Sequence, residues 1–418
     1  MTSTTCQIDE TGPYPVITVS SPAELGEQIQ RARDASQGIY PLGGRTALDL
    51  GLPPSKPGIA VDLTRLTQVI DYPARDMTIT VQAGIRMAEL QQMLSKEGQR
   101  LPIDVPHADR ATLGGIIATN TSGSHRFGLG TLRDYIIGIT TYNDEGQETK
   151  AGGRVVKNVA GYDFCKLHTG ALGTLGCISQ VTLKVRPIPE SQALLTFGCN
   201  GVPLERAFEE LHQSRTRPTC IDLVNGAAAQ WLGQRSGMKL PEQSWVVIVG
   251  FEDMEAAVSW QLQQAIRELT HLGIPGVEAL AGSSAGPLWQ ALTDLLAPDE
   301  SRLTLKAGLL PGRLAEFVRL ASDGSASSLI HAHAGNGIVR MHHLQEENLA
   351  QVRPRIDRLS QAVAGMGGHL TIPRCPAAWK RELPVWGRTR PDSWLHHQVK
   401  KSLDPRGLFN PGRFVDGI

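Results

Sequence analysis

Apolar and polar positions along the first half of the chain alternate in short runs that are separated by helical patterns. Five runs have the pattern of strands: residues 14–20, 58–63, 78–84, 135–143 and 177–189. Ser21 followed by Pro22 predicts a capped helix that continues to about residue 36. Residues 86–98 predict a second helix, which ends at Gly98. This alternation of strands and helices predicts a domain of mixed α and β structure.

The second half of the chain repeats one order of elements twice. The first pass predicts strand 193–198, helix 203–214, strands 219–224 and 245–251 and helix 254–272, and the second predicts strand 302–308, helix 311–321, strands 328–334 and 337–343, helix 346–365 and strand 368–372. Each pass matches the split βαβ arrangement of ferredoxin-like domains. We therefore expect a duplicated ferredoxin-like sheet with helices on one face. Pro354 is expected to kink the last helix or to move its start.

Composition excludes several classes of function. Among the 418 residues, Lys plus Arg and Asp plus Glu number 41 each, so charge gives no reason to expect nucleic acid or an acidic membrane as a partner. No secretory signal and no membrane-spanning run is visible, which favours a cytoplasmic protein. The six cysteines are scattered without a CxxC pair, so we expect free thiols and no iron–sulfur cluster in this chain.

Glycine-rich segments cluster in the first half of the chain. They lie at 41–51 (PLGGRTALDLG), 111–134, 157–163 and 170–187. Gly43 and Gly44 are compatible with an ordinary tight turn or with a loop whose main-chain N–H groups hold a phosphate, because glycine permits positive φ and close approach of a ligand. The repetition of such segments in order favours the ligand-binding alternative. None of them has the GxGxxG sequence of a Rossmann site.

These segments resemble the FAD-binding domain of the vanillyl-alcohol oxidase/PCMH flavoprotein superfamily. The similarity lies in PLGGRTALDLG, TLGGIIATNTSG, RDYIIGITTYNDEG, GGRVVKNVAGYD and GTLGCI, and LDPRGLFNPGRF near the end resembles the closing segment. Within the superfamily, the chain is most similar to the FAD-binding E subunits of bacterial glycolate oxidases. The resemblance implies an α+β fold in which two α+β subdomains bind FAD and a ferredoxin-like cap follows. The expected boundaries are a flexible N-terminus at 1–14, an FAD-binding domain at 15–190, a cap at 191–394 and a C-terminal segment at 395–418 that returns to the flavin.

The resemblance also implies the residues that bind FAD. The expected pyrophosphate loop is Leu42, Gly43, Gly44, Arg45 and Thr46; the segment beside the flavin is Thr112, Gly114, Gly115, Thr119 and Gly123; the adenosine side is Gly173, Gly176 and Ile178; and Asn410 returns to the flavin ring. Some members of the superfamily tether the flavin through a His in the first glycine loop. Because Arg45 stands in that neighbourhood here, we expect FAD to be bound without a covalent link.

The candidate catalytic residues lie on a predicted hairpin at 329–343. A two-residue turn at Asn336-Gly337 would place His333 opposite Arg340 and His331 opposite His342, with all four side chains on one face of the sheet. Such a cationic face could hold a carboxylate and accept a proton from a substrate. The alternative is a pair of edge strands with solvated side chains. His369 and Arg374 are secondary candidates, and Trp386 either covers the flavin or belongs to the core.

Two functions are the main candidates for this sequence, and an oxygen-using oxidase of sugars or alcohols is a third alternative. The first is an FAD-dependent oxidoreductase that oxidises a small 2-hydroxy acid such as glycolate to glyoxylate. The second is a non-catalytic, FAD-carrying subunit that transfers electrons or supports an assembly. The hairpin is only faintly similar to the HxGDGNxH signature of metal-using members, and the GEHG block is missing, so no metal site is expected. The resemblance implies a complex with a second FAD subunit and an iron–sulfur subunit, with at most peripheral association with the inner face of a membrane.

Overall fold

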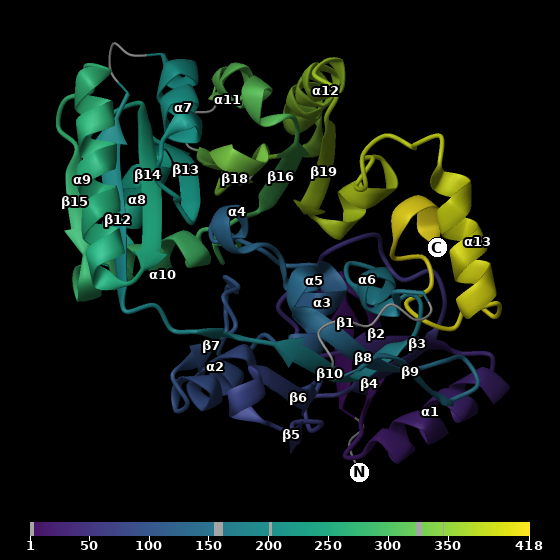
Figure 1. Ribbon diagram of the computed structural model, residues 1–418. Helices are drawn as coiled ribbons and strands as arrows, with labels where there is room; N and C mark the ends of the chain where they lie inside the picture. The colour runs from purple at the N-terminus through teal and green to yellow at the C-terminus, as the bar shows by residue number, and fades with distance from the viewer. Residues whose placement is uncertain (1–3, 154–161, 200–202, 323–327, 346) are drawn as a thin grey trace. The chain divides into compact units, whose positions relative to one another are not determined.

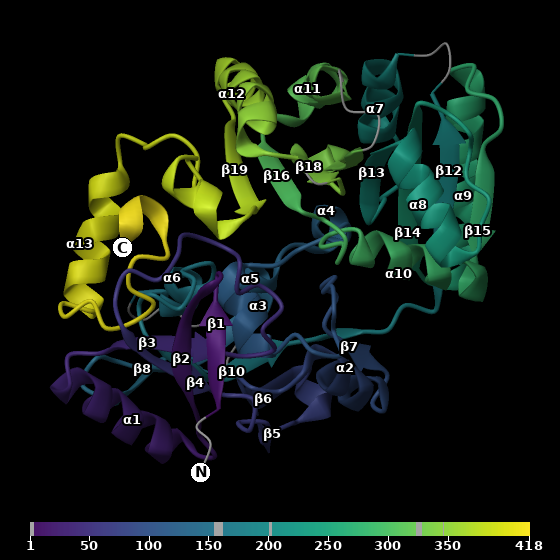
Figure 2. The same ribbon diagram turned by 180° about the vertical axis from the view of Figure 1, so that it is seen from behind.

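The computed structural model describes residues 4–153, 162–199, 203–322, 328–345 and 347–418. The chain forms two compact units, shown in Figures 1 and 2. The first unit contains Met1–Thr121, Thr131–Ile188 and Lys380–Ile418, and the second contains Ser122–Gly130 and Pro189–Trp379. These bounds differ from the expected ones: the C-terminal segment joins the first unit from Lys380 rather than from residue 395, and Ser122–Gly130 belongs to the second unit. Most of the GGRVVKNVAGYD block (154–161) lies outside the described residues.

A four-stranded sheet forms one half of the first unit. Its order is β1-β2-β4-β3, with β1 (Thr5–Ile8), β2 (Thr11–Thr18), β3 (Gly38–Leu42) and β4 (Gly58–Asp62). Helix α1 (Pro22–Asp34) begins at the predicted residue, because Ser21 Oγ accepts a hydrogen bond of 3.2 Å from the Glu24 N–H. Leu25 and Ile29 of α1 pack into the core with apolar residues of β3 and β4.

The expectation of a flexible N-terminus at 1–14 is wrong for the residues that the structure describes. Strand β1 pairs antiparallel with β2, and Ile8 is only 1 % exposed. Asp9 in the turn between the two strands forms a buried ion pair with Lys380, with 2.5 Å between Oδ1 and Nζ. The short polar sequence before residue 14 gives no sign of the Asp9–Lys380 ion pair, because Lys380 is about 370 residues away from Asp9 in the chain.

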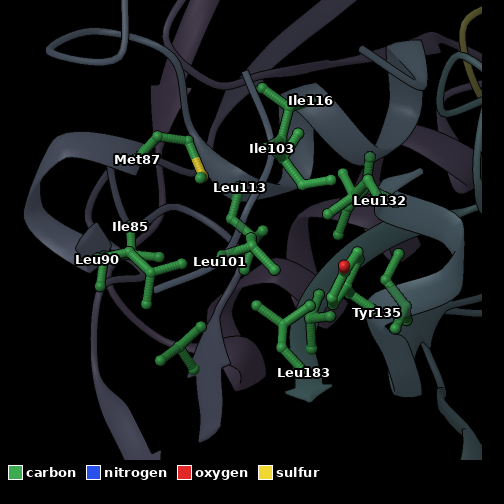
Figure 3. Packing of buried hydrophobic residues seen from close by; sticks show 14 of the residues in the cluster. Ile85, Met87, Leu90, Leu101, Ile103, Leu113, Ile116, Leu132, Tyr135 and Leu183 are labelled. Atoms are coloured by element: carbon green, nitrogen blue, oxygen red, sulfur yellow. The ribbon is translucent and has the colours of Figure 1, made fainter. Parts of the chain in front are cut away.

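A five-stranded sheet forms the other half of the first unit. Its order is β5-β6-β10-β8-β9, with β5 (Val69–Asp71), β6 (Thr78–Gln82), β8 (Ile136–Tyr142), β9 (Glu148–Gly152) and β10 (Cys177–Lys184), and a separate pair is formed by β7 (Gln99–Arg100) and β11 (Arg186–Pro187). The helices of this half are α2 (Met87–Ser95), α3 (Leu113–Thr119), α5 (Leu132–Tyr135) and α6 (Phe164–His168). Figure 3 shows part of their shared core, which contains Leu90, Leu113, Leu132 and Leu183.

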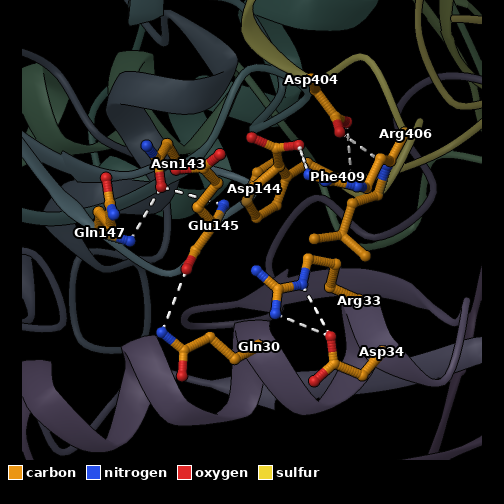
Figure 4. Close-up of polar contacts among 11 residues, drawn as sticks. Gln30, Arg33, Asp34, Asn143, Asp144, Glu145, Gln147, Asp404, Arg406 and Phe409 are labelled. Carbon is orange, nitrogen blue, oxygen red and sulfur yellow. Dashed lines mark hydrogen bonds and ion pairs between the residues drawn. The ribbon is translucent and has the colours of Figure 1, made fainter.

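The C-terminal segment is attached to the first unit by polar contacts, some of which Figure 4 shows. Helix α13 (Ser393–Leu403) is followed by Asp404, whose carboxylate accepts hydrogen bonds from the N–H groups of Leu408 and Phe409. Arg406 donates to Asp144 at 2.7 Å, in the turn between β8 and β9. Residue Phe409 then forms a parallel bridge with Ile39 of β3. The segment around Phe409 therefore lies against the start of β3.

The second unit is built on one eight-stranded sheet. Its order is β15-β12-β14-β13-β17-β18-β16-β19, with β12 (Ser191–Gly198), β13 (Cys220–Asn225), β14 (Trp245–Asp253), β15 (Glu278–Ala281), β16 (Leu303–Gly308), β17 (Ser328–His333), β18 (Ile338–His343) and β19 (His369–Arg374). Each half of this sheet is formed by one β-α-β-β-α-β pass. When the four strands of a pass are numbered in chain order, they lie side by side in the order 4-1-3-2. The two halves meet where β13 pairs with β17. The predicted duplicated ferredoxin-like fold is confirmed.

The helices of the second unit cover more of the sheet than predicted. The four expected helices are α7 (Leu204–Gln213), α9 (Glu255–His271), α11 (Leu314–Ser322) and α12 (Leu349–Gly365), and the sequence analysis missed α8 (Gly226–Ser236) and α10 (Gly286–Asp294) as well as strand β15. Helices α8 and α10 pack on Leu194, Val224 and Val246, while the alternate residues of these strands are also buried. Both faces of the half of the sheet that contains β12, β13 and β14 are therefore covered. The expectation of helices on one face is wrong for this half. Helix α12 contains Pro354 and begins at Leu349.

The hairpin of β17 and β18 has a different register from the predicted one. His331 is opposite Arg340, and His333 is opposite Ile338, which shifts the pairing by two residues. The connection is a four-residue loop, because Ala334–Asn336 form a 3₁₀ turn and Gly337 follows with φ of 66°. A shift of two residues keeps the same side chains on the same face. Both strands lie inside the sheet and are buried, so the alternative of solvated edge strands is also wrong.

Candidate functional site

The loop after β3 presents a row of main-chain donors. Leu42 ends the strand, and Arg45 has a left-handed φ of 58°. In the described part of the chain, the N–H groups of Gly43, Gly44, Arg45 and Thr46 donate no hydrogen bond. Successive N–H groups in a turn that includes a left-handed residue form a concavity that binds anions. This loop therefore fits the pyrophosphate of a dinucleotide.

The two glycines of this loop are required for close packing. A Cβ atom on Gly43 would lie 2.1 Å from Thr112 Oγ1, and one on Gly44 would lie 1.9 Å from the carbonyl oxygen of Arg110. Neither glycine has a positive φ. The loop instead needs glycine because its backbone lies directly against the segment that leads into α3.

Helix α3 has its first donors already satisfied. The N–H groups of Leu113 and Gly114 donate to the carbonyl oxygens of Ile85 and Ala83 at 2.9 and 2.7 Å. Gly115 N–H points to Thr112 Oγ1 at 3.4 Å, the capping contact of this helix. Residues 113–115 therefore contribute shape to the site rather than free amide donors. Thr119 Oγ1 is bonded to the Gly115 carbonyl oxygen at 3.0 Å.

The third glycine segment meets the end of the chain. Asn410 Nδ2 donates to the carbonyl oxygen of Leu172 at 2.6 Å, and the Asn410 N–H donates to the carbonyl oxygen of Ile39 at 2.8 Å. A Cβ atom on Gly173, which has a φ of 65°, would lie 3.2 Å from Asn410 Nδ2. Gly176 packs against the Tyr142 carbonyl group. Ile178 follows in β10 and is buried.

Most of the predicted FAD residues belong to these adjoining segments of the first unit. The exception is Gly123, which belongs to the second unit, where its neighbours contact Asp222 and Arg340. The Arg45 guanidinium is bound by Asp62, with 2.8 Å between Nη2 and Oδ2, so its contribution at the loop is the main-chain N–H. Trp386 lies in the first unit against Phe414 and donates to the Arg413 carbonyl oxygen.

The second unit holds a buried polar cluster on β13, β17 and β18. Asp222 accepts hydrogen bonds from His331 Nε2 at 3.0 Å and from His333 Nδ1 at 2.9 Å. Arg340 Nη1 donates to His333 Nε2 at 2.6 Å, and Arg340 Nη2 donates to the Ser122 carbonyl oxygen at 3.1 Å. Three of the four predicted catalytic residues, His331, His333 and Arg340, therefore meet at one place. Asp222, which the sequence analysis missed, joins them.

The hydrogen bonds assign the charge state of this cluster. His333 donates through Nδ1 and accepts through Nε2, which requires the neutral ring. Burial lowers the pKa of His333 to about 4, although the Asp222 carboxylate opposes this shift. Burial also works against ionisation of Asp222, but His333 and His331 hold its pKa well below the usual value. At neutral pH the cluster thus contains the Asp222 carboxylate, the neutral imidazole of His333 and the Arg340 guanidinium.

Lys306 and His342 lie on the same face of the sheet. Lys306 of β16 is directly opposite Arg340, and within the described residues its ammonium group makes no hydrogen bond or ion pair. Burial, followed by repulsion from Arg340 and Arg126, lowers the pKa of Lys306 to about 7. His342 is bonded through Nδ1 to Thr304 Oγ1 at 3.1 Å, and burial lowers its pKa well below the usual value. An amine that is partly neutral at pH 7 therefore lies beside a permanent cation.

Asp222, His331 and His333 place three potential metal-ligand atoms within 4.8 Å of one another. Each imidazole nitrogen that faces this point already donates to Asp222. The Arg340 guanidinium lies 2.6 Å from the other nitrogen of His333. A fixed positive charge at this distance opposes a divalent cation. These residues therefore fit a metal ion poorly.

The secondary candidates lie near this face. His369 and Arg374 are in β19, opposite Gly308 and Thr304 of β16. Arg374 donates to the Pro298 carbonyl oxygen at 3.2 Å. His343, the second residue of one His-His pair, points to the other face and is bonded to Ser328 Oγ at 2.5 Å. The two histidines of that pair therefore do not bind one ligand together.

Comparison with known proteins agrees with the architecture and the glycine loops. The family model "FAD binding domain" matches residues 13–152, and the model "FAD linked oxidases, C-terminal domain" matches residues 203–414. The chain belongs to the FAD-linked oxidases. Its cofactor is FAD, and the predicted PCMH-type fold class is confirmed.

Several curated proteins are similar over nearly the whole chain. Glycolate oxidase subunit GlcE of Escherichia coli is 28 % identical, and the match covers 93 % of this chain and 96 % of that protein. A D-lactate dehydrogenase of Anaerostipes hadrus is 31 % identical, with coverage of 96 % and 89 %. A solved structure of alkyldihydroxyacetonephosphate synthase has a TM-score of 0.69 at 18 % identity and covers 95 % of this chain and 75 % of that one, which establishes a common fold.

Two residues of the site carried a signal that the sequence analysis did not use. Asp222 is the one charged residue in the strand CIDLVN, and Lys306 is the one charged residue in LTLKAG. A charged side chain inside a strand that is otherwise apolar is costly unless it is paired or functional.

Among the described helices, none has the length and apolar character needed to cross a bilayer.

Proposed function

We propose that this chain oxidises a small 2-hydroxy acid, with glycolate as the first candidate, and that a partner subunit receives the electrons. The observation that carries the proposal is the Arg340–Lys306 pair, two cationic groups on one face of the second unit with a histidine cluster behind them. The similarity to a glycolate oxidase subunit and to D-lactate dehydrogenases favours the same substrate class. Bound FAD supplies an acceptor for two electrons.

Arg340 is the proposed anchor of the substrate carboxylate. A guanidinium stays charged at every pH of interest and matches the geometry of a carboxylate. Here it is oriented by His333 Nε2 and by the Ser122 carbonyl oxygen. Asp222 fixes the tautomer of His333, so that the nitrogen facing Arg340 is an acceptor. In this proposal His331 and His333 therefore position Arg340, rather than react with the substrate themselves.

Lys306 is the proposed acceptor of the hydroxyl proton. A general base works best when its pKa is near the operating pH, and burial brings the pKa of Lys306 to about 7. Its amine makes no hydrogen bond among the described residues and lies one strand away from Arg340. A carboxylate held by Arg340 would place the neighbouring hydroxyl group within the reach of a lysine side chain from the next strand.

The alternative function is an FAD-carrying subunit without catalysis of its own. One observation favours it: His331 is 0 % exposed and His333 is 1 % exposed, so the histidine cluster is closed to solvent. In that case the cluster would serve as a structural core, and a second FAD subunit would oxidise the substrate.

Anaerobic mixing of the purified protein with glycolate and with D-lactate distinguishes the two functions. The proposal expects loss of the visible flavin absorbance with at least one 2-hydroxy acid. Persistent absorbance with every 2-hydroxy acid in the panel, in a protein whose flavin is still reduced by dithionite, would instead support the non-catalytic subunit.

A further inference from the structure

Two buried cations near the end of the chain bind four consecutive main-chain carbonyl groups. The carbonyl oxygens of residues 48–51 alternate between the two donors: Lys380 Nζ donates to Asp49 and, at 2.9 Å, to Gly51, and Arg413 Nη2 donates to Leu48 at 2.8 Å and to Leu50 at 2.5 Å. Lys380 is 3 % exposed and Arg413 is 4 % exposed. Every peptide carbonyl in this stretch is thereby bound to a buried positive charge.

The N-terminal hairpin completes this arrangement. Asp9 Oδ1 lies 2.5 Å from Lys380 Nζ, and both side chains are buried. A buried ammonium group is stable only when its charge is compensated and its donors are used. Asp9 supplies the charge compensation, and the carbonyl groups use the remaining donors. Segments from the start, the first quarter and the end of the chain therefore meet at Lys380.

This stretch directly follows the loop with the unpartnered amide donors. Thr46 is the last residue of the loop, and the Leu50 N–H donates to the Ala47 carbonyl oxygen in the turn that follows. On its other side, the loop is fixed by Leu42 at the end of β3. Because the N–H groups of the loop make no hydrogen bonds, its position depends on these two attachments, on the Arg45–Asp62 ion pair and on its packing against residues 110–112.

We propose that Lys380, Arg413 and Asp9 act as a brace that positions the pyrophosphate-binding loop, 42–46, for FAD. None of the three side chains belongs to the loop, and they act through the carbonyl groups of residues 48–51. The brace makes the C-terminal segment and the N-terminal hairpin necessary for tight FAD binding. Loss of the brace leaves the four-stranded and five-stranded sheets of the first unit intact. The main-chain N–H groups of residues 43–46 then lose their fixed direction.

The test compares FAD binding by the apoproteins of Lys380→Met and Lys150→Met with wild type. Lys150 is the matched control, because it pairs with Glu148 at the surface of the same unit at 2.7 Å. FAD is added to each apoprotein and its fluorescence quenching gives the dissociation constant, while circular dichroism monitors folding. We expect the dissociation constant to rise at least tenfold in Lys380→Met and to stay within twofold of wild type in Lys150→Met. Lys380→Arg should recover part of the loss.

A second variant keeps the test decisive if Lys380→Met does not fold. Asp9→Asn retains an oxygen acceptor for Lys380 but removes the compensating charge, and we expect FAD to dissociate from it at least threefold faster. A folded Lys380→Met protein that binds FAD as tightly as wild type would overturn the proposal. A lower melting temperature with an unchanged FAD dissociation constant in either variant would also overturn it, because the brace would then stabilise only the fold.

Discussion

Replacing Gly44 with alanine should weaken FAD binding through a steric conflict that the structure locates. The new Cβ atom would lie 1.9 Å from the Arg110 carbonyl oxygen, 2.5 Å from the Arg110 carbonyl carbon and 2.9 Å from Ala111 Cα. The first contact is roughly 1.5 Å short of ordinary van der Waals separation, and all three partners are backbone atoms that cannot rotate away. The loop must therefore move away from the segment that precedes α3.

The expected cost follows from this displacement. Overpacking of this kind costs about 1–3 kcal/mol, and if the strain is relieved by moving the loop out of its FAD-binding position, affinity falls roughly 5- to 150-fold. Fluorescence quenching of FAD by the apoprotein measures this change. Gly365→Ala is the control, because a Cβ atom at the end of α12 meets nothing within 4 Å. If Gly44→Ala binds FAD as tightly as wild type and melts at the same temperature, the packing argument is refuted.

Three further predictions concern the cofactor, the assembly and pH. Acid precipitation should release the yellow chromophore into the supernatant, since Arg45 stands where some relatives carry a tethering His, and colour retained in the pellet would contradict this. Gentle purification should recover a second FAD subunit and an iron–sulfur subunit with this chain, whereas full dye-linked activity with glycolate by the chain alone would argue against such a complex. The rate of flavin reduction should rise as the pH passes through about 7, because only the neutral amine of Lys306 can accept a proton and a bound carboxylate can only raise the pKa of that amine. Lys306→Met should abolish this rise, and a wild-type rate that falls over the same range would contradict the assigned role.

Local patterns in the sequence were sufficient to predict most of the second unit. Strand β14 is a short apolar run, and α9 and α12 are long segments with helical periodicity, so their existence follows from local preferences. Helix α8 escaped prediction because GAAAQWLGQRS begins with glycine and has no clear apolar stripe. The register of β17 and β18 was wrong because Asn336-Gly337 suggested a two-residue turn, whereas Gly337 ends a four-residue loop.

The candidate site could be predicted only in part, because its polar contacts join residues far apart in sequence. His331, His333 and Arg340 were found on one hairpin, yet Asp222 reaches them only through the pairing of β13 with β17. Lys306 stands out in the sequence only as the one charged residue of its strand, and its position opposite Arg340 follows from the pairing of β16 with β18. In the predicted FAD loop, the sequence suggested glycine for its conformational freedom and for the close approach of a ligand. Close approach to residues 110–112 requires glycine there, and no local pattern reveals that approach.

The rate of anaerobic flavin reduction by glycolate, compared between wild type and Arg340→Ala, tests the central claim most directly. Loss of a charge-assisted contact costs about 1.5–3 kcal/mol, which corresponds to a rate roughly 10- to 150-fold lower. We expect glycolate to reduce the wild-type flavin, and we expect Arg340→Ala to retain FAD and thermal stability while its flavin is reduced at that lower rate. Equal rates in the two proteins, or no reduction of the wild type by any 2-hydroxy acid, would contradict the assignment of this face as the place where the hydroxy acid is oxidised.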